Sequence, residues 1–143
     1  WQTVELFYLD ALKSYEPYHC DEIKVTDFLS RMDYAYAVAD LVVSRAGASS
    51  ISELSLLGKP SILVPSPNVA EDHQTHNARA LSDKGAAILV RDVEAVDTMV
   101  DTALATIASK EKLQSLSDNV LKLAYPNSAE KIVNEILKLG NKE

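Results

Sequence analysis

The residues best suited to chemistry begin with a run of small side chains, Arg45-Ala46-Gly47-Ala48-Ser49-Ser50, followed by Ile51-Ser52-Glu53. Small residues let backbone amides approach a ligand closely, and a helix start offers N–H groups and the positive end of its dipole. This combination suits a phosphate or diphosphate, with Glu53 about one turn away to accept hydrogen bonds from two sugar hydroxyls. The alternative is a tight turn in which Ser50 and Glu53 form a capping box.

A second polar segment reads Asp72-His73-Gln74-Thr75-His76-Asn77-Ala78. A His-Gln pair supplies both donors and acceptors, which suits a polyhydroxylated ligand, although plain exposure to solvent explains the same polarity. Zinc would need a third ligand beside His73 and His76, and Asp72 faces elsewhere on a helix. We therefore expect no metal here.

A third segment, residues 26–32, contains Phe28, Leu29 and Met32. These side chains are most simply core or loop-packing residues. The alternative is a small apolar slot for a flat base, whose edge would be recognised by backbone groups near Leu29.

The elements that position these segments follow from hydrophobic patterning. Apolar runs predict strands over 41–44, 61–65 and 87–90, and a shorter one over 23–25. Helical spacing covers 4–16, 31–39, a segment from Ser49 or Ser50 to before Gly58, 72–84, and most of the chain after residue 92.

These strands are apolar throughout, which indicates burial on both faces. We predict an α/β fold, a Rossmann-like parallel sheet with helices on both faces and a helical C-terminal segment. In such sheets ligands bind beyond the carboxyl ends of the strands, so the loops after Val25, Ser44 and Pro65 are the ones to inspect.

Composition limits the classes of partner. The 143 residues fit one domain, and 14 basic against 21 acidic residues leave a net charge of −7. This charge argues against nucleic acid as the main partner and gives no support for binding anionic lipid through this segment. The single Cys20 excludes an internal disulfide and a thiolate zinc cluster. Because the chain opens at Trp1-Gln2-Thr3 without an initiator Met, we expect a piece of a longer polypeptide.

Several catalytic and metal-binding motifs are absent from the sequence, which narrows the range of reactions it could catalyse. The sequence has no Asp-x-Asp to hold a divalent ion against a nucleotide diphosphate, so backbone amides, a helix dipole and Arg45 would have to carry that charge. It also has no G-x-S-x-G motif and no poised Cys–His pair, and no cofactor is predicted.

Several of these stretches together closely resemble the MurG family of GT-B glycosyltransferases. The resemblance rests on Ala39 to Ala48, Ser52-Glu53-Leu54, Gly58 to Pro65, and Asp72-His73-Gln74 with Asn77-Ala78; it is strong over 28–90. That family transfers N-acetylglucosamine from UDP-GlcNAc to lipid I, giving lipid II in peptidoglycan synthesis. The resemblance implies that residues 1–143 form a single donor-binding domain, incomplete at its N-terminus.

The resemblance also implies roles for individual residues. The backbone of Leu29 would contact uracil, and Glu53 the ribose hydroxyls. The diphosphate would lie at the helix start formed by Gly47, Ala48, Ser49 and Ser50, with Arg45 nearby. The sugar hydroxyls would contact His73, Gln74 and Asn77 of the polar segment.

The remaining expectations concern parts that precede Trp1. The lipid I acceptor site, the membrane-contacting patch and the general base are expected in an N-terminal domain, which would place the whole enzyme at the cytoplasmic face of the bacterial inner membrane. The family usually has Gly where this chain has Val4, so the first turn is expected to differ. Two alternatives stay open: another UDP-sugar GT-B enzyme, such as a UDP-GlcNAc 2-epimerase, and a non-catalytic nucleotide-sugar binding module.

Overall fold

The structure is a computed structural model that describes residues 5–18, 20–67 and 72–140. It divides into two compact units, residues 1–38 and residues 39–143. Trp1-Gln2-Thr3, which sit where the family has similar residues, and Val4, where the first turn was expected to differ, lie outside the described residues.

The first unit contains helix α1 (Glu5–Tyr15), the 3₁₀ turn η1 (Glu16–Tyr18) and helix α2 (Met32–Val38). The strand predicted over 23–25 is wrong, because these residues adopt neither strand nor helix. The Tyr15 hydroxyl lies 2.9 Å from the carbonyl oxygens of Cys20 and Ile23 and accepts a hydrogen bond from the Cys20 N–H. A side chain thus occupies backbone groups that a neighbouring strand would otherwise pair.

The second unit is built on a three-stranded parallel sheet in the order β1-β2-β3. The strands are β1 (Val42–Ser44), β2 (Ser61–Leu63) and β3 (Ile88–Leu89), with Val43 opposite Ile62 and Leu63 opposite Leu89. The central strand is completely buried. The predicted parallel α/β fold is confirmed, although each strand is shorter than its apolar run.

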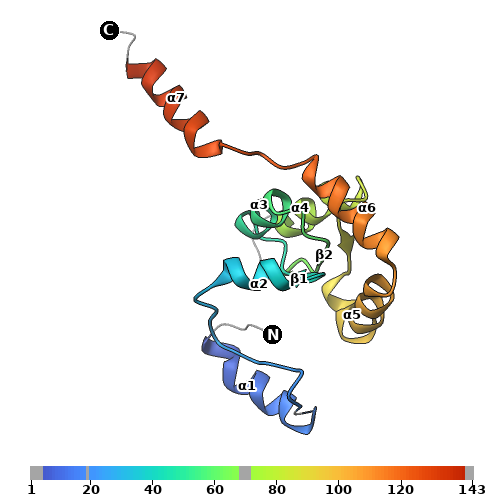
Figure 1. Cartoon of the computed structure of the whole chain (residues 1–143). Coiled ribbons are helices and arrows are strands. Elements are labelled where there is room, and N and C mark those ends of the chain that lie inside the picture. The colour runs from blue at the N-terminus through green and yellow to red at the C-terminus, as the bar shows by residue number, and fades with distance from the viewer. Residues whose placement is uncertain (1–4, 19, 68–71, 141–143) are drawn as a thin grey trace. The chain divides into compact units, whose positions relative to one another are not determined.

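Helices cover both faces of this sheet (Figure 1). Because the strands step across the sheet in one direction, right-handed crossovers place α3 (Ala48–Leu56) and α4 (His73–Ser82) on the same face, where they contact each other. Helix α5 (Asp92–Ile107) covers the other face. Its Ala95 and Ala103 pack against a core of Ile62, Val64 and Val90.

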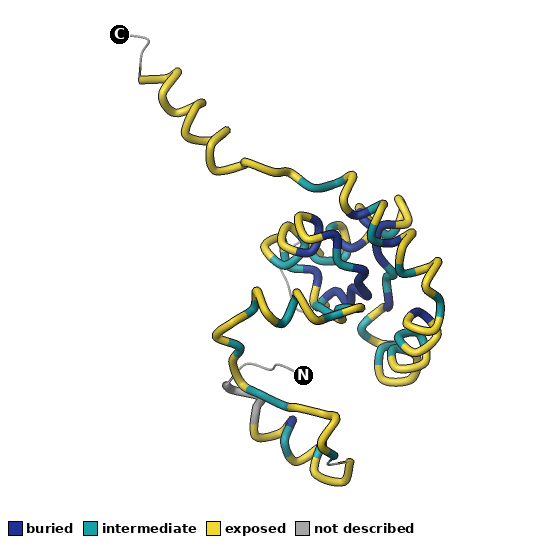
Figure 2. The backbone as a smooth tube through the Cα atoms, in the orientation of Figure 1, coloured by how far each residue is buried: buried dark blue, intermediate teal, exposed yellow. Residues whose placement is uncertain are grey.

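The remaining helices are α6 (Lys110–Leu121), which contacts α3 and α5, and α7 (Ser128–Gly140). Figure 2 shows α7 exposed along its whole length. Among the described residues, none of the helices combines the length and the apolar character that crossing a membrane requires.

Helical spacing gives α5 an apolar stripe of Val93, Val96, Val100, Ala103, Leu104 and Ile107, and of these Ala103 packs against the core. Its five large members are exposed: Val93, Val96, Val100, Leu104 and Ile107. Helix α5 instead packs through small residues, which let its backbone approach the sheet closely.

Candidate functional site

The first part of the site is the amino terminus of α3, directly after β1. The N-cap is Gly47, and no described side chain caps the helix. The first helical hydrogen bond runs from the Ile51 N–H to the Gly47 carbonyl at 3.0 Å, so the amides of residues 48–50 precede the helical ladder. The alternative capping box is wrong, because Ser50 already lies inside the first turn.

Gly47 is not required by the backbone of this turn. Its φ of −68° and ψ of 146° are extended values that any residue adopts. A Cβ placed on it would meet only the Ser50 Oγ, at 3.9 Å, an ordinary contact. The fold therefore tolerates a methyl group here, and the glycine leaves open the approach to the amides that follow.

Glu53 lies on the outer side of the same helix. It follows Ser49 by four residues and Ser50 by three, which places it one turn along on their side of the helix. Glu53 is exposed, whereas the next two residues, Leu54 and Ser55, are buried. A carboxylate at this position can reach a ligand that is held at the helix start.

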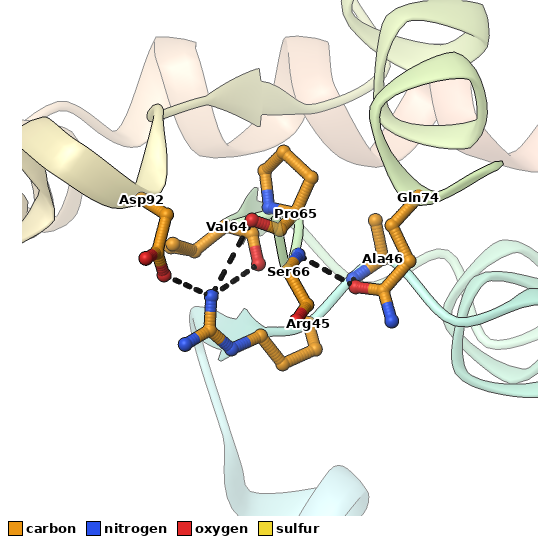
Figure 3. A network of polar contacts seen from close by, with 7 residues as sticks. All are labelled: Arg45, Ala46, Val64, Pro65, Ser66, Gln74 and Asp92. Carbon is orange, nitrogen blue, oxygen red and sulfur yellow. Dashed lines mark hydrogen bonds and ion pairs between the residues drawn. The ribbon is translucent and has the colours of Figure 1, made fainter. Parts of the chain in front are cut away.

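Helix α4 connects the loops that follow β1 and β2. The Gln74 Oε1 accepts hydrogen bonds from the Ala46 N–H at 3.2 Å and from the Ser66 N–H at 2.9 Å (Figure 3). The Asn77 Nδ2 donates to the Ala46 carbonyl at 3.1 Å. The buried peptide groups of Ala46 are thus held on both sides by one helix.

This arrangement fixes the chemistry that the two amides can offer a ligand. Both backbone partners of Gln74 are donors, so its Oε1 faces them and its Nε2 keeps its N–H groups for a ligand. Asn77 has the opposite orientation, with Nδ2 engaged and Oδ1 remaining as an acceptor. His73, the first residue of α4, is exposed beside them.

The third component is Arg45, the first residue after β1. Its Nη1 forms an ion pair with the Asp92 Oδ1, and it lies 3.3 Å from the Val64 carbonyl oxygen and 3.4 Å from that of Pro65 (Figure 3). Sequence reasoning missed Asp92. The only signal that could have suggested it is its position at the start of α5, directly beyond the third strand.

The second unit therefore gathers most of the predicted site at the carboxyl ends of β1 and β2. The helix start, Glu53 and Arg45 come from β1 and α3, and His73, Gln74 and Asn77 come from α4. Leu29 is half-buried in the first unit, so it is not among the residues that the second unit assembles.

Two open depressions lie away from the predicted site residues. An open depression of about 530 Å³ lies in the first unit, beside Leu12 and Ile23, and one of about 450 Å³ lies beside Lys59 and Pro60. Neither is lined by a predicted site residue. Across the described parts of the chain, no three His, Cys, Asp or Glu side chains gather as a metal site requires.

Comparison with known proteins identifies the family to which this chain is similar. A family model described as the glycosyltransferase family 28 C-terminal domain matches residues 7–136. Curated relatives from Porphyromonas gingivalis and Cytophaga hutchinsonii are 54% and 52% identical over 100% and 99% of this chain. Both are named UDP-N-acetylglucosamine–N-acetylmuramyl-(pentapeptide) pyrophosphoryl-undecaprenol N-acetylglucosamine transferase.

These relatives are much longer than this chain, which spans 38% and 37% of their lengths. The crystal structure of Acinetobacter baumannii MurG matches with a TM-score of 0.83 and 28% identity over 96% of this chain and 42% of its own. The expected resemblance and the expected fold, a C-terminal GT-B domain, are both confirmed. By its sequence and its architecture, the chain belongs to the family of glycosyltransferase family 28 C-terminal domains.

Proposed function

We propose that the protein to which this chain belongs transfers N-acetylglucosamine from UDP-GlcNAc to lipid I, forming lipid II, and that residues 1–143 are its donor-binding domain. The observation that carries this proposal is the uncapped start of α3, where three backbone amides precede the helical ladder at the carboxyl edge of the sheet. The names of the relatives describe the same transfer.

The donor diphosphate binds at this helix start. The amides of residues 48–50 and the helix dipole offset its negative charge, and Arg45 adds a positive charge nearby. Glu53, one turn further, accepts hydrogen bonds from the ribose hydroxyls. The backbone of Leu29 contacts the uracil.

The sugar binds against the start of α4. Gln74 donates through Nε2 and Asn77 accepts through Oδ1, so the pair matches hydroxyl groups, which both donate and accept. His73 adds a further polar contact. The rigid hydrogen bonds to Ala46 and Ser66 hold these amides in place before the sugar arrives.

The reaction is an inverting displacement at the anomeric carbon. The lipid I hydroxyl forms a bond to that carbon while the bond to the UDP oxygen breaks, and the leaving diphosphate gains negative charge. Donors already fixed at the α3 start stabilise this charge without reorganising. The general base, the lipid I site and the contact with the cytoplasmic face of the inner membrane lie in the N-terminal domain.

Two substitutions in the full-length enzyme test the donor site. Glu53→Ala removes charge-assisted hydrogen bonds worth about 1.5–3 kcal/mol, so the KM for UDP-GlcNAc should rise roughly 10- to 150-fold. Gly47→Ala should also raise this KM, because its methyl group intrudes on the approach to the amides, yet it should leave the unfolding free energy unchanged or slightly higher.

The matched controls are Glu111→Ala, an exposed carboxylate on α6, and Gly140→Ala, where a Cβ meets nothing within 4 Å. Steady-state kinetics should give both controls the wild-type KM for UDP-GlcNAc. A wild-type KM in Glu53→Ala would contradict the ribose role, and one in Gly47→Ala would contradict the diphosphate position. Binding of UDP-GlcNAc without turnover by the full-length protein would favour a binding module instead.

A further inference from the structure

The ion pair between Arg45 and Asp92 ties together the exits of all three strands. Arg45 follows β1, the carbonyls of Val64 and Pro65 follow β2, and Asp92 follows β3 as the first residue of α5. Figure 3 shows the guanidinium between these groups. A charged group is therefore held by contacts that only the assembled sheet provides.

All of these contacts use one nitrogen of the guanidinium. The Asp92 Oδ1 and both carbonyl oxygens approach Nη1, whereas Nε and Nη2 form no hydrogen bond with another described residue. The Arg45 side chain keeps 55% of its surface exposed, and that of Asp92 keeps 33%. The guanidinium is thus anchored at one corner while its remaining N–H donors stay accessible.

We propose that Asp92 is a positioning residue for the donor: it holds Arg45 by Nη1 so that Nε and Nη2 are oriented to meet the diphosphate. This inference rests on the proposed donor-binding function. An arginine side chain that is already ordered does not have to lose its rotamer freedom when the anion binds. A planar guanidinium with two donors in fixed positions also matches phosphate oxygens.

The opposite role is competition, in which Asp92 neutralises Arg45 and withholds it from the diphosphate. The two roles predict opposite changes in donor affinity when Asp92 is replaced. If Asp92 positions Arg45, removing the acceptor weakens donor binding; if Asp92 competes, removing it strengthens donor binding. Substitutions that separate the acceptor from the charge distinguish the two.

Asp92→Ala removes both the acceptor and the charge, while Asp92→Asn removes the charge and keeps an oxygen for Nη1. In the full-length enzyme, we expect Asp92→Ala to raise the KM for UDP-GlcNAc about three- to tenfold and to leave the KM for lipid I unchanged. Asp92→Asn should stay within about twofold of wild type, because its oxygen still anchors the guanidinium. Asp97→Ala is the control: it makes the same charge change at an exposed position of α5.

A double-mutant cycle with Arg45→Ala isolates the coupling. Asp92→Ala should have no further effect on the donor KM in the Arg45→Ala background. A general loss of stability would instead lower kcat through the folded fraction and leave the donor KM alone. Additive effects in the cycle, or donor binding in Asp92→Ala as tight as wild type or tighter, would overturn the positioning role.

A measurement of Arg45 mobility in the absence of UDP-GlcNAc completes the test. In the full-length protein, ¹⁵N relaxation of the Arg45 Nε should report an ordered side chain in wild type and in Asp92→Asn, and a mobile one in Asp92→Ala. Equal mobility in all three would also overturn the role. If wild type binds no UDP-GlcNAc, the proposed function fails together with this inference, whereas normal binding with an inert Asp92 removes this inference alone.

Discussion

Replacing Gln74 tests whether its two hydrogen bonds to the backbone stabilise the fold. Its Oε1 is the acceptor for the N–H groups of Ala46, which is completely buried, and Ser66, which is half-buried. Gln74→Met keeps the length of the side chain but removes the acceptor. Both amides then lose this acceptor.

The magnitude follows from the burial of the two amides. An unsatisfied buried N–H costs about 1–3 kcal/mol, which applies in full to Ala46, whereas water can partly replace the partner of Ser66. We therefore expect Gln74→Met to lower the free energy of unfolding by about 2–4 kcal/mol. Gln74→Glu keeps a carboxylate oxygen for both amides and lies in the first turn of α4, so it should lose less than about 1 kcal/mol.

Urea unfolding followed by circular dichroism measures these changes, and hydrogen exchange of the Ala46 amide locates them. That amide should exchange slowly in wild type and in Gln74→Glu, and faster in Gln74→Met. The control is Gln114→Met on α6, where an exposed glutamine donates to Asp118 at 2.8 Å; its effect should stay within about 0.5 kcal/mol. Equal losses in Gln74→Glu and Gln74→Met would refute the reasoning.

Two further predictions concern a glycine and an exposed ion pair. Gly58→Ala should destabilise the chain by at least about 1–2 kcal/mol in the same urea assay, because φ is +62° and the new Cβ would lie 2.8 Å from the Leu121 Cγ. Adding Leu121→Ala should relieve part of this loss. A wild-type unfolding midpoint in Gly58→Ala would contradict the prediction. The Arg91 guanidinium holds the pKa of the Glu94 carboxyl below its ordinary value. The pair therefore stabilises the fold at pH values above the pKa that Glu94 has in the unfolded chain. This stabilisation is lost as the pH falls through the lower pKa of Glu94 in the folded chain. Carbon-13 NMR titration of Glu94 should show a higher pKa in Arg91→Gln, and an unchanged pKa would disprove the assignment.

The local features of the site could be predicted from the sequence because their causes are local. An apolar run followed by small residues predicted both a strand and a helix start with accessible amides, and the spacing of Glu53 placed it one turn along. The parallel α/β fold followed from strands that are apolar on both faces. The helix was expected to begin at Ser49 or Ser50, whereas the structure has Gly47 as the N-cap and Ala48 as the first helical residue.

The long-range features were decided by the tertiary structure alone. Gln74 and Asn77 looked like ligand contacts, but the backbone groups that they also hold lie 28 and 31 residues away at Ala46. Arg45 and Asp92 are 47 residues apart and meet only because parallel strands release their loops at one edge of the sheet. The stripe on α5 likewise follows a helical pattern, yet its five large members are exposed, while its Ala103 and the neighbouring Ala95 face the core. Close packing depends on the shape of the opposing surface, and no local pattern encodes that shape.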